Sequence, residues 1–199
     1  MGGTCCGHPT GRTEYEESSA SLTVCVKREL GKPVGLELDF TDGKTARVLG
    51  LSEGAVKAEL ADIKPGDHLV AVNGAQTLSE MMGHLKGDAN LEITLQRPAG
   101  FGVKLVKTDS LGIDYTHAPT GDSLLIRSVL SSGALRQWND THEDSVVRPL
   151  DRIVAANGCR GSWSKILSEI QRSHELELVI VPCPAVGAAP GDPSAGKVV

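Results

Sequence analysis

Aromatic residues and long apolar runs are nearly missing from this 199-residue sequence. Phe, Trp and Tyr together make up 3% of the chain, so its core has to be built from aliphatic side chains. No apolar run reaches the roughly 20 residues of a membrane-spanning helix. The amino-terminal residues also lack the apolar segment of a secretory signal. We therefore expect neither a transmembrane span nor export through a signal peptide.

Positive charge and cysteine are limited as well. The 20 Lys and Arg residues are outnumbered by 25 Asp and Glu, and the net charge of −5 argues against nucleic acid as a partner. The five cysteines are odd in number and include no Cys-x-x-Cys pair, so neither a disulfide framework nor a zinc ribbon is indicated. These features predict a reducing, intracellular environment and a cytoplasmic protein.

Catalytic signatures are missing too. The six histidines are scattered without metal-ligand spacing. The sequence contains no nucleophile elbow, phosphate loop or dinucleotide fingerprint. We therefore predict a non-enzymatic protein with no metal and no cofactor.

The most informative stretch that is present covers residues 33–40, Pro-Val-Gly-Leu-Glu-Leu-Asp-Phe. Leu36 and Leu38 alternate with acidic residues, which is the period of a half-buried strand. Gly35 stands directly before this strand and can adopt backbone angles that a side chain forbids. The loop can therefore aim successive N–H groups into one anion-binding nest. A nest beside a strand edge suits an extended peptide that ends in a carboxylate.

The residues at 33–36 resemble the carboxylate-binding loop of PDZ domains. The following segments resemble the same family in order, above all a Pro-Gly-Asp turn at 65–67, a strand, and an Asn-Gly turn at 73–74. Apolar residues at helical spacing come next, from Leu78 to Leu85. The remaining expected elements are strands at 22–28, 46–51 and 91–95 and a short helix at 54–59.

The second half of the chain repeats the first in the same order. Residues 147–158 echo 63–74, and residues 110–115 echo the loop and strand at 33–38. Ordered self-similarity of this length indicates two copies of one unit. The predicted fold is mainly β with α: two PDZ-like, partly open β-barrels or sandwiches in tandem, each capped by two helices.

These patterns divide the chain into five segments. The extra length of the second unit falls near 138–145, where we expect a loop insertion. The linker is short enough to favour a fixed tandem. The expected segments are a disordered amino-terminal stretch at 1–20, a first unit at 21–97, a linker at 98–100, a second unit at 101–182 and a disordered Pro/Gly/Ala-rich tail at 183–199.

The resemblance to PDZ domains implies a peptide site in the first unit. Loop N–H groups would hold the ligand carboxylate, and Arg28 or Lys32 could help. Leu78, at the helix start, cannot hydrogen-bond a ligand Ser or Thr, which favours an apolar ligand residue there. His84 is expected to be solvated, and plain core packing is the alternative interpretation of the apolar residues. The implied peptide-binding residues are Val34, Gly35, Leu36, Glu37, Leu38, Leu78, Met82 and Leu85.

The second unit carries a matching set of residues with two departures. Trp163, at the helix start, would either shape an apolar pocket or fill the groove. Asp109 beside the nest disfavours a carboxylate, and Lys107 partly offsets it. Peptide binding and a purely structural or partner-docking role therefore both stay open for this unit. The implied residues are Leu111, Gly112, Ile113, Asp114, Tyr115, Trp163, Leu167 and Ile170.

The first six residues, Met-Gly-Gly-Thr-Cys-Cys, suggest acylation. Removal of the methionine would expose Gly2 for N-myristoylation, although position 6 is Cys where the pattern has Ser or Thr. One myristoyl chain binds a membrane only marginally, so Cys5 and Cys6 are the expected palmitoylation sites. The alternatives are a plain tail with two incidental thiols or a Cys-Cys-Gly-His metal site.

Together these features predict a scaffold that binds the C-termini of membrane or cytosolic proteins whose last residue is apolar. It would lie in the cytoplasm, or on the cytoplasmic face of a membrane through its acyl groups. One alternative is a self-associating membrane tether, a homodimer that resembles the Golgi reassembly stacking proteins. Another is a regulatory subunit of an enzyme assembly.

Overall fold

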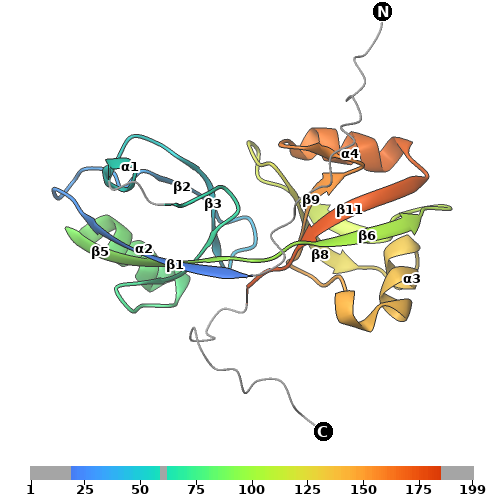
Figure 1. Cartoon of the computed structure of the whole chain (residues 1–199), viewed down its shortest axis with the longest axis horizontal. Coiled ribbons are helices and arrows are strands. Elements are labelled where there is room, and N and C mark those ends of the chain that lie inside the picture. The colour runs from blue at the N-terminus through green and yellow to red at the C-terminus, as the bar shows by residue number, and fades with distance from the viewer. Residues whose placement is uncertain (1–18, 59–61, 185–199) are drawn as a thin grey trace, which may run out of the picture. The chain divides into compact units, whose positions relative to one another are not determined.

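The computed structural model describes residues 19–58 and 62–184. Contacts divide the described chain into two compact units, unit 1 at Ser19–Arg97 and unit 2 at Pro98–Cys183 (Figure 1). Each unit has its own aliphatic core. The predicted acylation sites Gly2, Cys5 and Cys6 lie outside the described residues, as does most of the predicted carboxyl-terminal tail.

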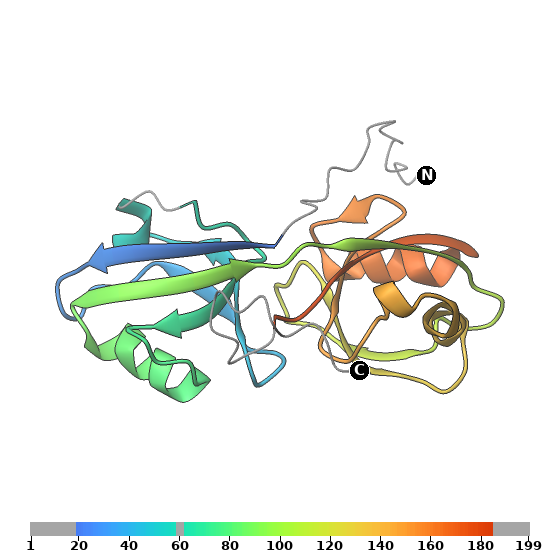
Figure 2. The ribbon, with the colours of Figure 1, turned by 60° about the horizontal axis from the view of Figure 1, so that its bottom comes forward.

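The described part of unit 1 is one antiparallel sheet with two helices. The strands follow the order β1-β5-β4-β3-β2, so that the first two strands in sequence lie at opposite edges of the sheet. Figure 2 shows β1 and β5 side by side, in agreement with their pairing along the whole length of β1. Its elements are β1 (Ala20–Lys27), β2 (Leu36–Asp39), β3 (Ala46–Leu51), α1 (Ala55–Ala58), β4 (His68–Val72), α2 (Leu78–Gly87) and β5 (Asn90–Arg97).

Local sequence explains these elements. Val26 of β1 and Leu91 of β5 pair across the sheet and are both buried, while Cys25 between the inward residues of β1 is exposed. Thr77 caps α2, because its hydroxyl accepts a hydrogen bond from the N–H of Glu80 at 3.4 Å and donates one to the Glu80 carboxylate at 2.6 Å. The helix then buries one apolar face against the sheet.

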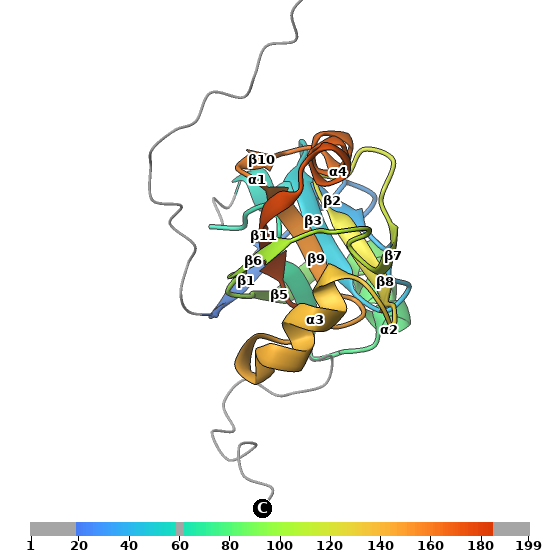
Figure 3. The same ribbon diagram turned by 90° about the vertical axis from the view of Figure 1, so that its right-hand side faces the viewer.

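Unit 2 repeats this architecture with one added strand. Its sheet follows the order β6-β11-β9-β8-β7, and β10 pairs with β9. Figure 3 views this unit from the side and shows the sheet between α4 and α3. Its elements are β6 (Phe101–Val106), β7 (Ile113–Thr116), β8 (Leu124–Val129), α3 (Ala134–Thr141), the 3-10 helix η1 (Glu143–Ser145), β9 (Arg152–Ala156), β10 (Cys159–Arg160), α4 (Trp163–Arg172) and β11 (Glu175–Val181).

The predicted fold class is confirmed: the chain is mainly β with α, in two antiparallel sheets of the same strand order. Across residues 19–58 and 62–184, neither sheet closes into a barrel, and no helix is long and apolar enough to span a membrane.

Two sequence expectations were wrong. Ala20, placed in the disordered segment, already pairs with Arg97 in the sheet. The insertion expected as a loop near 138–145 is the end of α3 followed by η1. Its helical form is stabilised by Trp138, which stacks on His142 at 3.5 Å between ring centroids and donates a hydrogen bond to the Ser145 carbonyl at 3.0 Å.

Candidate functional site

A glycine at positive φ opens the loop before each edge strand. We call residues 33–36 and 110–113 the glycine loops of units 1 and 2. Gly35 has φ 90°, and a Cβ there would lie 2.9 Å from the Ser52 carbonyl oxygen and 3.0 Å from the Cα of Gly54. Both the backbone angle and the close approach therefore require glycine at this position.

The glycine loop of unit 2 is built in the same way. Gly112 has φ 79° and packs against Gly133, whose own φ is 110°. A Cβ on Gly112 would lie 2.9 Å from the Cα of Gly133, and one on Gly133 would lie 2.6 Å from the Cα of Gly112. In both units a second glycine, just before α1 or α3, thus lets the loop pack tightly on the following turn.

The glycine loops present backbone N–H groups that the fold does not use. Among the described residues, the N–H groups of Val34 and Gly35 donate to no backbone carbonyl, and the same holds for Leu111 and Gly112. Each loop therefore has two adjacent N–H donors without a backbone acceptor among the described residues. Such adjacent donors are the ones an anion-binding nest requires.

The sheet register shows which strand residues face the edge. The N–H of Ser52 donates to the Gly35 carbonyl at 3.0 Å, which makes Leu36 and Leu51 a pair without mutual hydrogen bonds. The backbone N–H and C=O of Leu36 therefore point away from β3. A bulge lies between Glu37 and Leu38, and the alternation along β2 turns the backbone of Leu38 the same way.

The corresponding bond in unit 2 runs from the N–H of Leu130 to the Gly112 carbonyl at 2.8 Å. Ile113, paired with Val129, therefore also directs its backbone to the free edge of β7. Tyr115 occupies the next edge-facing position. In both units the glycine loop leads directly into backbone that can accept an added strand.

Glu37 and Asp114 were expected to take part in the site, but they face elsewhere. Their backbones pair with Gly50 and Ser128 on the neighbouring strand. The Glu37 carboxylate would lie 3.2 Å from a Cβ on Gly50, and Asp114 lies 3.8 Å from Arg127 with both side chains exposed. The proposed ligand-facing positions are therefore the residues on either side of each acid.

A helix lies across from each edge strand. In unit 1, Leu78 is the first residue of α2, and Leu78 and Met82 pack partly buried beside the core residue Leu85. In unit 2, strand and helix enclose a pocket of about 230 Å³. The pocket is lined by Lys107, Asp109, Ser110, Leu111, Gly112, Ile113, Tyr115, Leu124, Leu130, Leu167, Ile170 and Gln171.

Near the glycine loop of each unit, a basic side chain donates hydrogen bonds to carbonyls at the end of the helix. Arg28 donates to the carbonyls of Lys32 at 2.7 Å, Leu85 at 2.6 Å and Asp88 at 2.9 Å. Its guanidinium thereby joins the loop to the end of α2, which the helix dipole favours. Arg28 therefore positions the loop, and its expected help in holding a carboxylate stays a prediction.

Lys107 occupies the same place in unit 2. The N–H of Lys107 bonds to His174 at 2.7 Å, as that of Arg28 bonds to Ala89 at 2.8 Å. Its ammonium donates to the carbonyls of Ile170 and Gln171 at the end of α4 and also lines the pocket. The positive charge of Lys107 thus lies near the nest, where it partly offsets the negative charge of Asp109.

Trp163 has a partner that the sequence did not suggest. Its ring stacks on His117, with 3.6 Å between centroids and 10° between planes. Its indole N–H donates to the Pro119 carbonyl at 3.1 Å, and its backbone N–H donates to Gly121 at 3.3 Å. The loop after β7 is therefore held on the start of α4, and Trp163 does not line the pocket.

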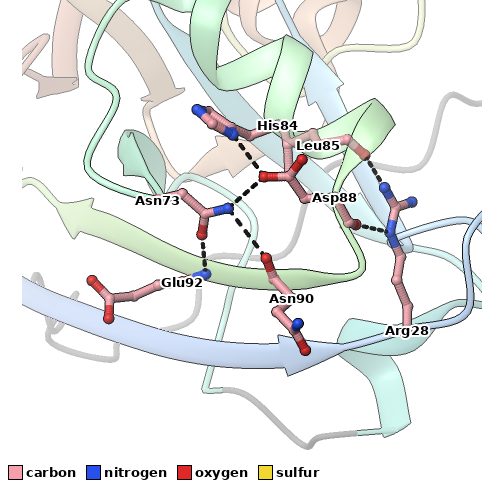
Figure 4. A network of polar contacts seen from close by, with 7 residues as sticks. All are labelled: Arg28, Asn73, His84, Leu85, Asp88, Asn90 and Glu92. Atoms are coloured by element: carbon pink, nitrogen blue, oxygen red, sulfur yellow. Dashed lines mark hydrogen bonds and ion pairs between the residues drawn. The ribbon is translucent and has the colours of Figure 1, made fainter.

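A polar network behind the unit 1 site anchors α2 to the sheet (Figure 4). The Asn73 amide donates to the Asp88 carboxylate at 2.8 Å and to the Asn90 carbonyl at 3.1 Å, and accepts from the Glu92 N–H at 2.7 Å. His84 Nδ1 lies 2.7 Å from Asp88 Oδ2. His84, which was expected to be solvated, keeps 36% of its side chain exposed and also pairs with Asp88. Hydrogen bonding from His84, and then from Asn73, lowers the pKa of Asp88.

In unit 2 the equivalent carboxylate comes from the helix itself. Glu169 accepts from Asn157 at 3.0 Å and from the Ser173 hydroxyl at 2.6 Å, and pairs with Arg172. Burial raises the pKa of Glu169, but the hydrogen bonds from Ser173, Asn157 and Arg172 outweigh it, so the net pKa is lowered. The network fixes α4 and with it one wall of the pocket.

Three site residues escaped the sequence analysis: Gly54, Gly133 and His117. The glycines did carry a signal, because Ser-Glu-Gly-Ala and Ser-Ser-Gly-Ala recur at the same place in the two repeats. His117 carried none. Among the residues the structure describes, no cluster of His, Cys, Asp and Glu is arranged to hold a metal ion.

No family model and no curated protein matches the sequence. Among solved structures, the chain is similar to INAD PDZ45 in complex with NG2 peptide, at 17% identity and a TM-score of 0.35, covering 92% of this chain and 99% of that one. It is also similar to INAD PDZ45 in complex with NORPA CC-PBM, at 16% identity and a TM-score of 0.34, covering 87% and 96%.

Proposed function

We propose that the chain is a non-enzymatic scaffold whose units bind C-terminal peptides of partner proteins by strand addition and carboxylate capture. One observation carries the proposal. In both units, edge-facing backbone begins directly at a glycine loop in which two adjacent N–H groups donate to no backbone carbonyl of the described residues. A peptide carboxylate would accept hydrogen bonds from those N–H groups, and the peptide backbone would pair with β2 or β7.

The walls of the site favour an apolar last residue. In unit 2, Leu111, Ile113, Leu167 and Ile170 line the pocket beside the glycine loop. In unit 1, partly buried Leu36 and Leu78 present similar chemistry. A site of this kind binds with roughly micromolar affinity, about −8 kcal/mol.

A library of free C-terminal peptides, with amidated copies, tests the proposal on the full chain. Val34→Asp and Ile113→Asp each place a carboxylate at one site, and Glu37→Gln and Asp114→Asn are matched controls on the outer face. We expect amidation and the site variants to weaken binding by about tenfold or more, with little change in the controls. Equal binding of acids and amides would overturn the proposal.

Membrane anchoring through Gly2, Cys5 and Cys6 is a separate part of the proposal and would place the scaffold on a cytoplasmic membrane face. Two lipid chains hold a protein far better than one. The myristate analogue should therefore label the wild type but not Gly2→Ala. The palmitate analogue should label the wild type but not the double change of Cys5 and Cys6 to Ser. An unlabelled wild-type protein would restrict the proposal to a cytoplasmic scaffold.

The self-associating tether is the less favoured alternative. The domains of the Golgi reassembly stacking proteins have a different strand order. In this chain the glycine loop lies between the first two strands of each unit. Sedimentation of the full chain without peptide distinguishes the two. A monomer agrees with the scaffold, and a stable homodimer favours the tether.

A further inference from the structure

The His117–Trp163 stack lies at the end of the unit 2 groove away from the glycine loop. Ile113, Tyr115 and His117 occupy alternate positions that share one side of β7 and its extension. The first two line the pocket and the third does not. Along the other wall, Ile170 and Leu167 line the pocket, while Trp163, one helical turn further, does not. The pocket therefore ends where the stack begins.

Three contacts hold the stack in place. Besides the ring contact at 3.6 Å, Trp163 donates hydrogen bonds to Pro119 and Gly121 in the loop after β7. Both rings are half-buried. Figure 1 shows this loop, in yellow, beside the start of α4. A ligand strand running along β7 from the glycine loop would thus meet a tethered pair of rings.

Unit 1 has a different pair at the same two positions. Phe40 follows β2 as His117 follows β7, and Leu78 begins α2 as Trp163 begins α4. Phe40 is 39% exposed. No hydrogen bond or ring contact links the described loop after β2 to the start of α2. The described residues of unit 1 therefore lack a stacked and hydrogen-bonded pair at these positions.

We propose that the stacked His117 and Trp163 rings limit the unit 2 site to the last two residues of an apolar peptide acid, while unit 1 accepts a longer segment. This inference rests on the proposed function. A ligand residue in an extended strand advances about 3.3 Å, and side chains alternate in direction. The third residue from the ligand end would therefore direct its side chain between Tyr115 and Trp163, where the stack begins.

Peptide length is the variable that tests this inference. The probes are acetylated peptides of two, four and six residues that all end in Leu-Val, as free acids and as amides. Each is titrated into the ¹⁵N-labelled full chain, and the amide signals of Gly35 and Gly112 report units 1 and 2 separately. For unit 2 we expect Kd to change by less than about twofold with length, and for unit 1 to fall by about tenfold or more.

Four variants assign the effect to the stack. His117→Ala and Trp163→Leu remove one ring each and should give unit 2 the length dependence of unit 1. His117→Phe keeps an aromatic partner and should retain the short footprint. His142→Ala is the matched control, because it removes the other His–Trp stack of the unit, at α3, and should leave the length dependence unchanged.

The outcomes separate the inference from the function on which it rests. If the six-residue acid binds wild-type unit 2 about tenfold more tightly than the two-residue acid, the stack does not limit the site and the inference is overturned alone. The same follows if His117→Ala leaves the length dependence unchanged. If acids and amides bind neither unit differently, carboxylate capture is wrong and both proposals fall.

Discussion

His84 of α2 and Glu169 of α4 occupy the same position in two helices of 10 residues each, yet one is a base and the other an acid. The exchange is compensated at the residue after the helix, which is Asp88 in unit 1 and Ser173 in unit 2. Each unit thus provides one carboxylate to the side-chain amide of its Asn-Gly turn, from a different position. The network is therefore retained, although the two units place its carboxylate on different residues.

We expect His84→Ala to raise the pKa of Asp88 toward its ordinary value of 3.8, because the hydrogen bond from His84 is the largest influence that lowers it. The folded pKa is depressed, so this carboxylate contributes to stability above pH 3.8 and the contribution is lost as the pH falls through the folded pKa. Carboxyl-carbon NMR titration of the full chain measures the shift. The control Asp140→Asn, in an exposed ion pair of α3, should leave Asp88 unchanged. An unaltered Asp88 pKa in His84→Ala would contradict the assigned cause.

We expect Glu169→Gln to lower the free energy of unfolding of unit 2 by about 1–3 kcal/mol at neutral pH, because a buried, hydrogen-bonded acceptor is lost. The net pKa of Glu169 is lowered from 4.5, so the difference from wild type should shrink as the pH falls below that value. Both tryptophans lie in unit 2, and their fluorescence follows its unfolding in urea.

The matched control for this variant is Glu177→Gln, whose exposed carboxylate lies 3.3 Å from Lys104. Exposed pairs contribute about 0–1 kcal/mol, so its effect should be small. Equal losses in the two variants would show that the Asn157 network adds nothing.

The elements that could be predicted are those whose apolar residues recur with a regular local period. The alternation of Leu36 and Leu38 predicts β2, and the apolar spacing from Leu78 predicts α2, because each side chain's burial depends on its own element. The repeated order of motifs then extends the interpretation to unit 2. These features needed no knowledge of which segments meet in space.

The unpredicted part depends on contacts between distant segments. His117 contacts Trp163 only because the loop after β7 folds back on α4. No spacing of residues in the sequence predicts that contact. The contact between His84 and Asp88 was not predicted, because Asp88 lies beyond the apolar pattern of the helix. The edge-facing choice between Leu36 and Glu37 required the register, which the alternation alone does not give.

We expect Asp151→Asn to gain stability relative to wild-type unit 2 as the pH rises from about 3 to 7. Burial raises the pKa of Asp151, although hydrogen bonds from the Arg148 and Cys183 N–H groups lower it in part. A raised folded pKa makes its stabilising contribution complete below pH 3.8 and lost as the pH rises through the folded value, opposite in sign to Glu169. Urea unfolding from about pH 3 to pH 7, followed by tryptophan fluorescence, measures the slope. An identical slope in wild type and variant would contradict a raised pKa.

We expect Gly112→Ala to destabilise unit 2 by more than about 1 kcal/mol, because φ is 79° and the new Cβ would meet the backbone of Ser132 and Gly133. Gly102→Ala in β6 is the control: no atom lies within 4 Å of its Cβ position, and φ is not positive. That change should be neutral or stabilising by up to about 1 kcal/mol. Because Gly112 also precedes the edge-facing backbone of β7, Gly112→Ala should weaken peptide binding to unit 2 under conditions where the unit stays folded. If both glycine variants unfold at the same urea concentration as wild type, the tight packing of Gly112 on Gly133 is not what shapes the loop.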